Sequence, residues 1–159
     1  MTVFERRIAT RAALLIATLA LLTARPPASA SPDSDKAKSD LDRLQGSWTC
    51  VSMERNGKPI PPESYKDGLL VMDGDTFTYT QGKQLVSRGK RVLHPETNPK
   101  GFDDQHSEGR FKGKTYFGIY EIQGDQFKTC NGSLGQERPK AFETKPGTGL
   151  LLIVYKRMR

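Results

Sequence analysis

Residues Ser39–Glu63 read SDLDRLQGSWTCVSMERNGKPIPPE and contain Trp48, the only tryptophan of the chain. Two leucines spaced three residues apart predict a short helix over Asp40–Gln45, and Gly46 ends it. The residues that follow look like a strand that stops at an Asn-Gly pair, a strong turn dipeptide. The largest apolar ring therefore stands where a helix gives way to the first strand, and it requires a buried position there.

The chain beyond Gly46 is β-rich almost to its end. Phe77 and Tyr79 alternate with threonines, the period-two pattern of a half-buried strand. Eight strands are predicted in succession, with no crossover helix between them: residues 47–55, 69–72, 76–80, 84–93, 101–105, 115–122, 126–130 and 150–157. Such a series predicts an all-β fold, an eight-stranded antiparallel up-and-down barrel with a short N-terminal helix.

The lengths of the connections differ between the two ends of this barrel. Alternate connections of an up-and-down barrel lie at the same end, which groups residues 56–68, 81–83, 106–114 and 132–149. Three of these four are long, whereas two of the connections at the opposite end are tight turns. We therefore expect a binding mouth at the end with the long loops.

The N-terminal residues have the layout of a secretory signal peptide. A basic start is followed by the apolar stretch Ala12–Leu22 and by the small residues Ala28-Ser29-Ala30, which predicts cleavage after residue 30. The apolar stretch is shorter than the roughly 20 residues that span a bilayer. We expect export to the periplasm or the outside of the cell, without stable membrane insertion. The alternatives are an uncleaved anchor and a twin-arginine signal at Arg6-Arg7.

The predicted domain organisation is simple. Residues 1–30 form the signal peptide, residues 31–38 a flexible tether, and residues 39–159 one barrel domain. The net charge of the chain is +7, of which residues 1–30 contribute +3, so that +4 remains for the other 129 residues. Their charges are interspersed, with no basic stripe or recognition motif, so nucleic acid is not an expected partner.

A Gly-x-Trp motif at the start of the first strand resembles the lipocalin signature. In that architecture the tryptophan closes one end of the barrel, and a basic side chain from the last strand lies over its ring. The matching residues here are Gly46, Trp48 and either Arg157 or Lys156. The resemblance implies that the first and last strands meet at a closed end.

The chain as a whole resembles a family of small exported lipocalin-like domains of planctomycete bacteria. The resemblance covers Leu41–Arg157 and depends on LQGSW, ERNGKPIP, GDTFTYT, FGIYEIQGDQFKTC, ERPKAFETKPGTG and VYKR, of which the segment at residues 137–149 is the most specific. Cys50 departs from it, since an aliphatic residue is expected there. The resemblance implies the fold and carries no activity with it.

The two cysteines, Cys50 and Cys130, lie on the first and seventh predicted strands. An oxidising compartment favours a disulfide. The eighth strand should run between them, however, and second-neighbour strands are about 9–10 Å apart, beyond the ~7 Å limit for bridged Cα atoms. Two buried thiols are the favoured state, with a bridge as the alternative.

The segment DDQHSE places Asp103, Asp104, His106 and Glu108 close together, and these are residue types that bind metals. No second ligand cluster accompanies them, so we expect a solvated loop and no metal site. His94 is expected to end a strand. No nucleophile elbow, phosphate-binding loop or paired carboxylates stand out, and no catalytic residue or cofactor is predicted.

Four residues are the candidates for binding a ligand: Tyr79, Tyr116, Tyr120 and Arg138. Tyr116 and Tyr120 share one face of a strand with Gly118 between them, which leaves space against the backbone. If this face points inward, it lines the barrel for a small, partly apolar ligand; the alternative is that the rings fill the core. We predict a non-catalytic binder of such a ligand, or else a protein-interaction or inhibitor module that uses the long loops.

Overall fold

The computed structural model describes residues 32–159, so the predicted signal peptide lies outside the described residues. A single helix precedes the strands, and one 3-10 turn (Pro62–Ser64) interrupts them. The elements are α1 (Pro32–Leu44), β1 (Gly46–Arg55), β2 (Lys58–Pro59), β3 (Gly68–Asp73), β4 (Thr76–Gln81), β5 (Gln84–His94), β6 (Gly101–Gly109), β7 (Thr115–Gln123), β8 (Gln126–Asn131) and β9 (Leu151–Arg157).

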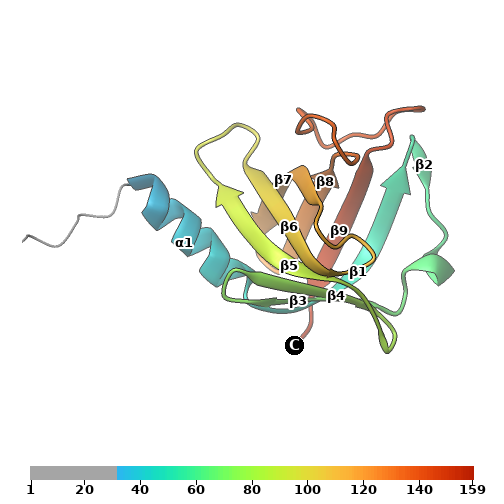
Figure 1. Cartoon of the computed structure of the whole chain (residues 1–159), viewed down its shortest axis with the longest axis horizontal. Helices are drawn as coiled ribbons and strands as arrows, with labels where there is room; N and C mark the ends of the chain where they lie inside the picture. Colours follow the sequence, from blue (N-terminus) through green and yellow to red (C-terminus); the bar gives the residue numbers. More distant parts are fainter. Residues whose placement is uncertain (1–31) are drawn as a thin grey trace, which may run out of the picture.

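The strands form a closed antiparallel barrel (Figure 1). From β3 onward each strand pairs with the next along the chain, and β1 pairs with both β3 and β9 and so closes the wall. β2 is a two-residue return that pairs with the end of β1 and adds no strand to the wall. The predicted fold, with its eight strands, is confirmed.

Two details differ from the prediction. β6 continues to Gly109, so the segment DDQHSE lies on a strand and not in a loop. The helix begins at Pro32, so residues 32–38 form its first turns where a tether was expected. Proline suits a first helical turn, and Asp33 and Asp35 complement the positive end of the helix dipole.

The two ends of the barrel differ in what covers them. We call the end with α1 and the turns at residues 73–76 and 123–126 the helix end, and the other the loop end. Ala37, Leu41 and Leu44 lie on one face of α1 and pack against the barrel core.

Within residues 32–159 no helix combines the length and apolarity that crossing a bilayer requires.

Trp48 is fully buried at the helix end. Its Nε1 donates a hydrogen bond of 2.7 Å to the carbonyl oxygen of Leu44, and its ring centroid lies 5.7 Å from that of Phe127. Arg157, its direct neighbour on β9, places its guanidinium carbon 4.2 Å from the centroid of the indole ring. The burial and the covering cation predicted for Trp48 are confirmed.

Arg157 also joins the helix to the last strand. Its guanidinium donates to the carbonyl oxygens of Gln45 and Arg43, the first at 2.6 Å. The last carbonyls of a helix have no partner within the helix, and a cation at this end opposes the dipole favourably. Gly46 begins β1 with φ of +99°, a value that favours glycine over residues with a Cβ.

Replacing Trp48 with Ala should lower the free energy of unfolding by about 3–5 kcal/mol, as a core truncation. Arg157→Ala should lower it by about 2 kcal/mol, through the lost ring contact and carbonyl hydrogen bonds. The double variant should lose less than the sum of the two, because the indole and the guanidinium stabilise each other. Urea denaturation measures all three values.

Arg159→Ala is the matched control, since Arg159 pairs with Asp125 at an exposed position near the same end. It should change the free energy of unfolding by less than about 0.5 kcal/mol. Strictly additive losses in the Trp48 and Arg157 variants would contradict the coupling.

Candidate functional site

Arg91 and Asp104 form an ion pair inside the barrel. They are register partners on β5 and β6 and point inward, and both are buried. Arg91 Nε donates to Oδ1 of Asp104 and Nη2 donates to Oδ2, each at 2.7 Å. This bidentate geometry is the strongest form of an arginine–carboxylate contact.

Aromatic rings surround the arginine. Its guanidinium carbon lies 4.6 Å from the ring centroid of Phe102, 5.4 Å from that of Phe127 and 5.7 Å from that of Phe77. Burial opposes the charge, but the adjacent Asp104 outweighs it and raises the pKa of Arg91. The result is a neutral pair in an apolar interior with a fixed set of hydrogen-bond donors.

Four buried polar atoms of the described residues have no hydrogen-bond partner: Arg91 Nη1, His106 Nδ1, Thr129 Oγ1 and Asn131 Oδ1. The strand registers place all four side chains on the inner face of the wall. Burial lowers the pKa of His106, so its ring is neutral at neutral pH and offers a donor or an acceptor. Buried polar atoms without partners are uncommon, which marks this interior as a candidate site.

The tyrosines predicted to line a cavity are divided between the two ends. Tyr116 and Tyr120 do point inward with Gly118 between them, but a side chain at position 118 would collide with the Phe102 ring, so the expected space is filled. The Tyr120 hydroxyl donates a hydrogen bond of 2.8 Å to Asp40 Oδ2 at the helix end. Tyr116 belongs to the loop end, with its ring centroid 5.2 Å from that of His106.

Tyr79 is partly buried near the loop end, and its hydroxyl donates to Gln81 Oε1 at 3.4 Å. Phe111 packs against both His106 and Tyr116, at 5.5 and 5.4 Å between ring centroids. Tyr79, Phe111 and Tyr116 are therefore the rings at the loop end, whereas Tyr120 lies at the opposite end of the barrel.

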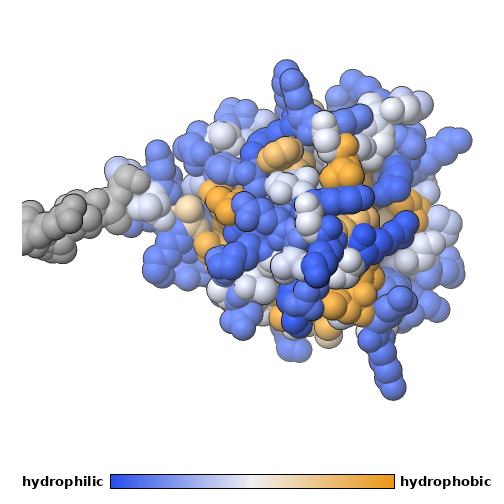
Figure 2. Space-filling view, viewed as in Figure 1, coloured by the Kyte–Doolittle hydropathy of each residue, from blue (hydrophilic) through white to orange (hydrophobic). Residues whose placement is uncertain are grey.

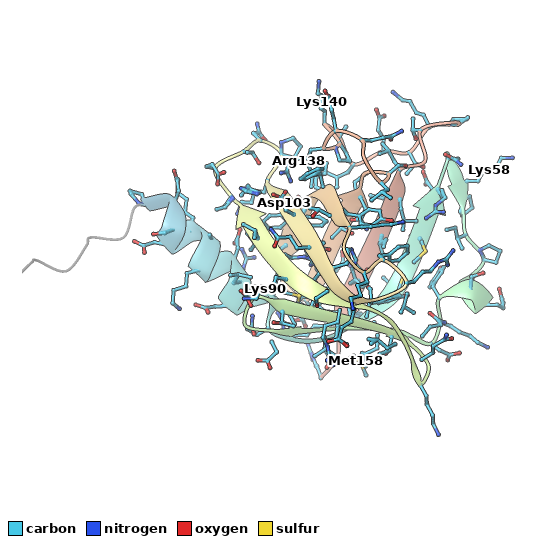
Figure 3. The ribbon with its side chains drawn as sticks, viewed as in Figure 1. Lys58, Lys90, Asp103, Arg138, Lys140 and Met158 are labelled. Atoms are coloured by element: carbon cyan, nitrogen blue, oxygen red, sulfur yellow. The ribbon has the colours of Figure 1, made fainter. Side chains whose placement is uncertain are left out.

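Arg138 lies outside the barrel wall. Its Nη1 donates to the carbonyl oxygens of Phe102 and Gly118, each at 2.7 Å, and its Nη2 donates to Asp103 Oδ1 at 2.7 Å. Figure 3 shows Arg138 beside Asp103, and Lys140 of the same segment pointing away from the wall. Arg138 therefore holds a loop in place and does not face the interior with the three tyrosines.

The loop that Arg138 holds, residues 132–149, is here called the strap. It runs over a row of register partners on the outer face of the wall that includes Gly101, Ile119, Cys130 and Leu152. The strap contacts this row at several points: Arg138 lies against Gly101, the carbonyl of Glu143 accepts from Cys130, and Thr144 bonds to Glu54. Ile119 and Cys130 are completely buried as a result.

The cysteines are both free and buried, as predicted. β9 lies between them, and in addition they face opposite sides of the wall: Cys50 is part of the barrel core, whereas Cys130 lies under the strap. Burial raises the pKa of each thiol to about 11. Both are therefore protonated thiols at neutral pH, which makes them poor nucleophiles.

The residues of DDQHSE alternate between the two faces of β6. Asp103 and Glu108 face outward, where Asp103 contacts His94 at 3.1 Å and Glu108 pairs with Arg88, whereas Asp104 and His106 face inward. They do not converge on one point, and no group of three or more potential metal ligands occurs in residues 32–159.

Asp40 is the centre of a second polar cluster, at the helix end. It is 4% exposed, and its Oδ2 accepts from Lys100 Nζ at 2.7 Å and from Tyr120 at 2.8 Å, while Arg43 lies 3.3 Å from Oδ1. Burial alone would raise the pKa of Asp40, but these three partners outweigh it and lower the pKa. The cluster fixes α1 to the end of β7.

The chain matches no family model, and no curated protein or solved structure is significantly similar to it. The site is therefore interpreted from its own geometry. Sequence reasoning missed Arg91, Thr129 and Asn131. A signal was available only for Arg91, which lies two residues before Leu93 in a predicted strand and so on the same face as this apolar residue.

Asp40→Asn should lower the free energy of unfolding at pH 7 by about 1.5–3 kcal/mol, the range for hydrogen bonds to a charged group. Because the pKa of Asp40 is lowered in the folded state, its contribution is present above the ordinary pKa near 4 and is lost as the pH falls through the folded value. Denaturation curves between pH 7 and pH 2.5 should show a smaller acid destabilisation in the variant.

Asp42→Asn is the matched control on the same helix, since Asp42 pairs with Lys38 in solvent. It should leave both the stability and its pH dependence close to those of the unmodified protein. Equal effects of the two substitutions would show that the buried cluster does not hold the helix.

Proposed function

We propose that the protein is a non-catalytic binding protein whose barrel takes a small, partly apolar ligand through the loop end. The observation that carries this proposal is the unpaired Nη1 of Arg91 within an aromatic interior. A few placed polar groups in an otherwise apolar lining are typical of ligand sites. Thr129 Oγ1 and His106 Nδ1 are two further unpaired polar atoms in the same interior.

The Arg91–Asp104 pair has no net charge, and this favours a neutral ligand over an anionic one. Asp104 already occupies two donors of the guanidinium at 2.7 Å, so a charged carboxylate would add a second anion to a site that holds only one cation. A carbonyl or hydroxyl oxygen can accept from Nη1 without this cost. The rings of Phe77, Phe102 and Phe127 would contact the apolar part of the ligand.

The interior is filled by side chains, so entry requires some of them to move. Tyr79, Phe111 and Tyr116 at the loop end are only partly buried. Rotation of these rings opens the mouth without disturbing the core at the helix end. The helix end stays closed, because Trp48 and Leu44 are fully buried there.

Native mass spectrometry of the protein purified from its source should reveal a co-purifying small mass that is released on denaturation. The variant Arg91→Met/Asp104→Leu should keep the barrel, since an apolar replacement of a buried ion pair is often neutral or stabilising, yet it should lose that mass. A folded double variant that retains the ligand, or a source protein without any bound mass, would contradict the proposal.

A second candidate is a protein-interaction or inhibitor module that uses Lys58–Asp67 and the strap. It is favoured by the fixing of the strap through Arg138, which presents Leu134 at 45% exposure. The face in Figure 2 carries its apolar residues in several separate patches among hydrophilic ones, and not as one large patch. A protein mass in the same native spectra would favour this candidate.

We also infer that the chain is an exported member of the lipocalin-like domains that it resembles. The covering of Trp48 by Arg157 supports this, since the resemblance implies that arrangement. N-terminal sequencing of the protein recovered from the periplasm or the medium should return Ser31. Recovery of an intact Met1 in the membrane fraction would instead indicate an anchor.

A further inference from the structure

The outer wall of the barrel carries a groove of about 420 Å³ that is separate from the interior. Thr76, Lys90, Gln105 and Thr115 are successive register partners on β4, β5, β6 and β7, and they form its floor on the side of the helix end. Arg88, Ser107 and Lys114 line it toward the loop end. Four strands of the rigid wall therefore contribute to one hollow.

The loop at residues 110–114, with the sequence RFKGK, borders this groove in a fixed conformation. Gly113 N donates to the carbonyl of His106 at 2.8 Å, and His106 N donates to the carbonyl of Lys114 at 2.9 Å. Phe111 packs inward against His106 and Tyr116, while Arg110, Lys112 and Lys114 are exposed. The aromatic anchor holds the cations outward beside the wall.

The charged side chains that line the groove are all cationic. Its lining contains the cations Arg88, Lys90 and Lys114 and no carboxylate. Arg88 and Lys90 have partners at the rim, Glu108 at 3.4 Å and Asp75 at 2.9 Å, and both pairs are largely exposed to solvent. Lys114 forms no ion pair among residues 32–159. Exposed pairs contribute little to stability, so these cations are available to another anion.

We propose that this groove binds a saccharide that carries an anionic group, a sulfate, phosphate ester or carboxylate. The cations match the anion, while Thr76, Gln105, Ser107 and Thr115 supply the hydroxyl and amide groups that exchange hydrogen bonds with sugar hydroxyls. The volume lies in the range of sites for drug-sized ligands, and so exceeds what a bare inorganic anion requires.

Two other anionic ligands fit the lining less well. Single-stranded nucleic acid is bound by stacking its bases on aromatic side chains, whereas His106, the one lining residue with a ring, turns that ring into the barrel. The chains of an anionic lipid are expected to pack against aliphatic or aromatic side chains, whereas the side chains that line the groove are those of Thr, Ser, Gln, His, Arg and Lys. The proposal concerns the outer wall, so it stands independently of a ligand in the interior.

Isothermal titration calorimetry of the purified protein against a sulfated and a carboxylated oligosaccharide tests the site, with polyphosphate of matched charge as the non-saccharide probe. Binding of at least one saccharide should weaken about tenfold in Lys114→Gln, as expected for the loss of one hydrogen bond to a charged group. Lys112→Gln should change it less than about twofold, because Lys112 lies on the same loop but does not line the groove.

Thr115→Val tests sugar recognition without a change in charge. It should weaken saccharide binding severalfold and leave binding of polyphosphate unchanged. Equal weakening by Lys112→Gln and Lys114→Gln would show diffuse attraction to a basic surface and overturn the proposal. So would a failure to bind either saccharide at low salt, or an affinity for polyphosphate at least as high with no effect of Thr115→Val.

Discussion

The last carbonyl oxygens of an α-helix have no partner within the helix, and at the end of α1 the closure of the barrel supplies partners for Arg43 and Leu44 and for Gln45, which follows the helix. Trp48 Nε1 donates to Leu44, and the Arg157 guanidinium donates to Arg43 and Gln45. Trp48 belongs to the first strand and Arg157 to the last, so the helix end, β1 and β9 are held by one arrangement. The β1–β9 pairing that these side chains cover leaves neither strand as an exposed edge, which proteins generally avoid.

A wall closed in this way encloses an interior, and the interior contains an ion pair that stability alone does not explain. Apolar replacements of buried ion pairs are often neutral or stabilising. Arg91 and Asp104 nevertheless lie among Phe77, Phe102 and Phe127, with one terminal nitrogen of the guanidinium unpaired. This retained cost beside an unpaired donor is the physical basis of the proposed ligand site.

Local patterns in the sequence predicted the wall well. Alternation in TFTYT, the Asn-Gly turn and the two tight turns at the helix end located seven strands within two residues of their ends, because each signal depends on neighbours in the chain. β6 was predicted too short, since DDQHSE is polar on both faces. Its inward residues Asp104 and His106 are stable there only because Arg91 and the rings of Phe77 and Tyr116 are brought to them by the fold.

The same limit applies to the candidate site. Tyr116 and Tyr120 were placed correctly on one face, but the filling of the space at Gly118 depends on Phe102, a residue of another strand. Arg138 was predicted to be one of the ligand-binding residues. Its actual partners are two backbone carbonyls and Asp103 on the outer wall, and no sequence pattern reveals a carbonyl partner.

β6 contributes to the strap contact, to the buried ion pair and to the outer groove, because its successive side chains alternate between the two faces of the wall. Asp103 faces outward to the strap, Asp104 inward to Arg91, and Gln105 outward to the groove. A register shift then follows: Gly89 pairs with His106, but Arg88 pairs with Glu108, which leaves Ser107 as an extra residue. If the pairing instead continued in regular register, alternation would turn Glu108 into the interior with His106, where it would lose Arg88. The bulge thus keeps a carboxylate out of the barrel and leaves Ser107 on the outer wall, where it lines the groove.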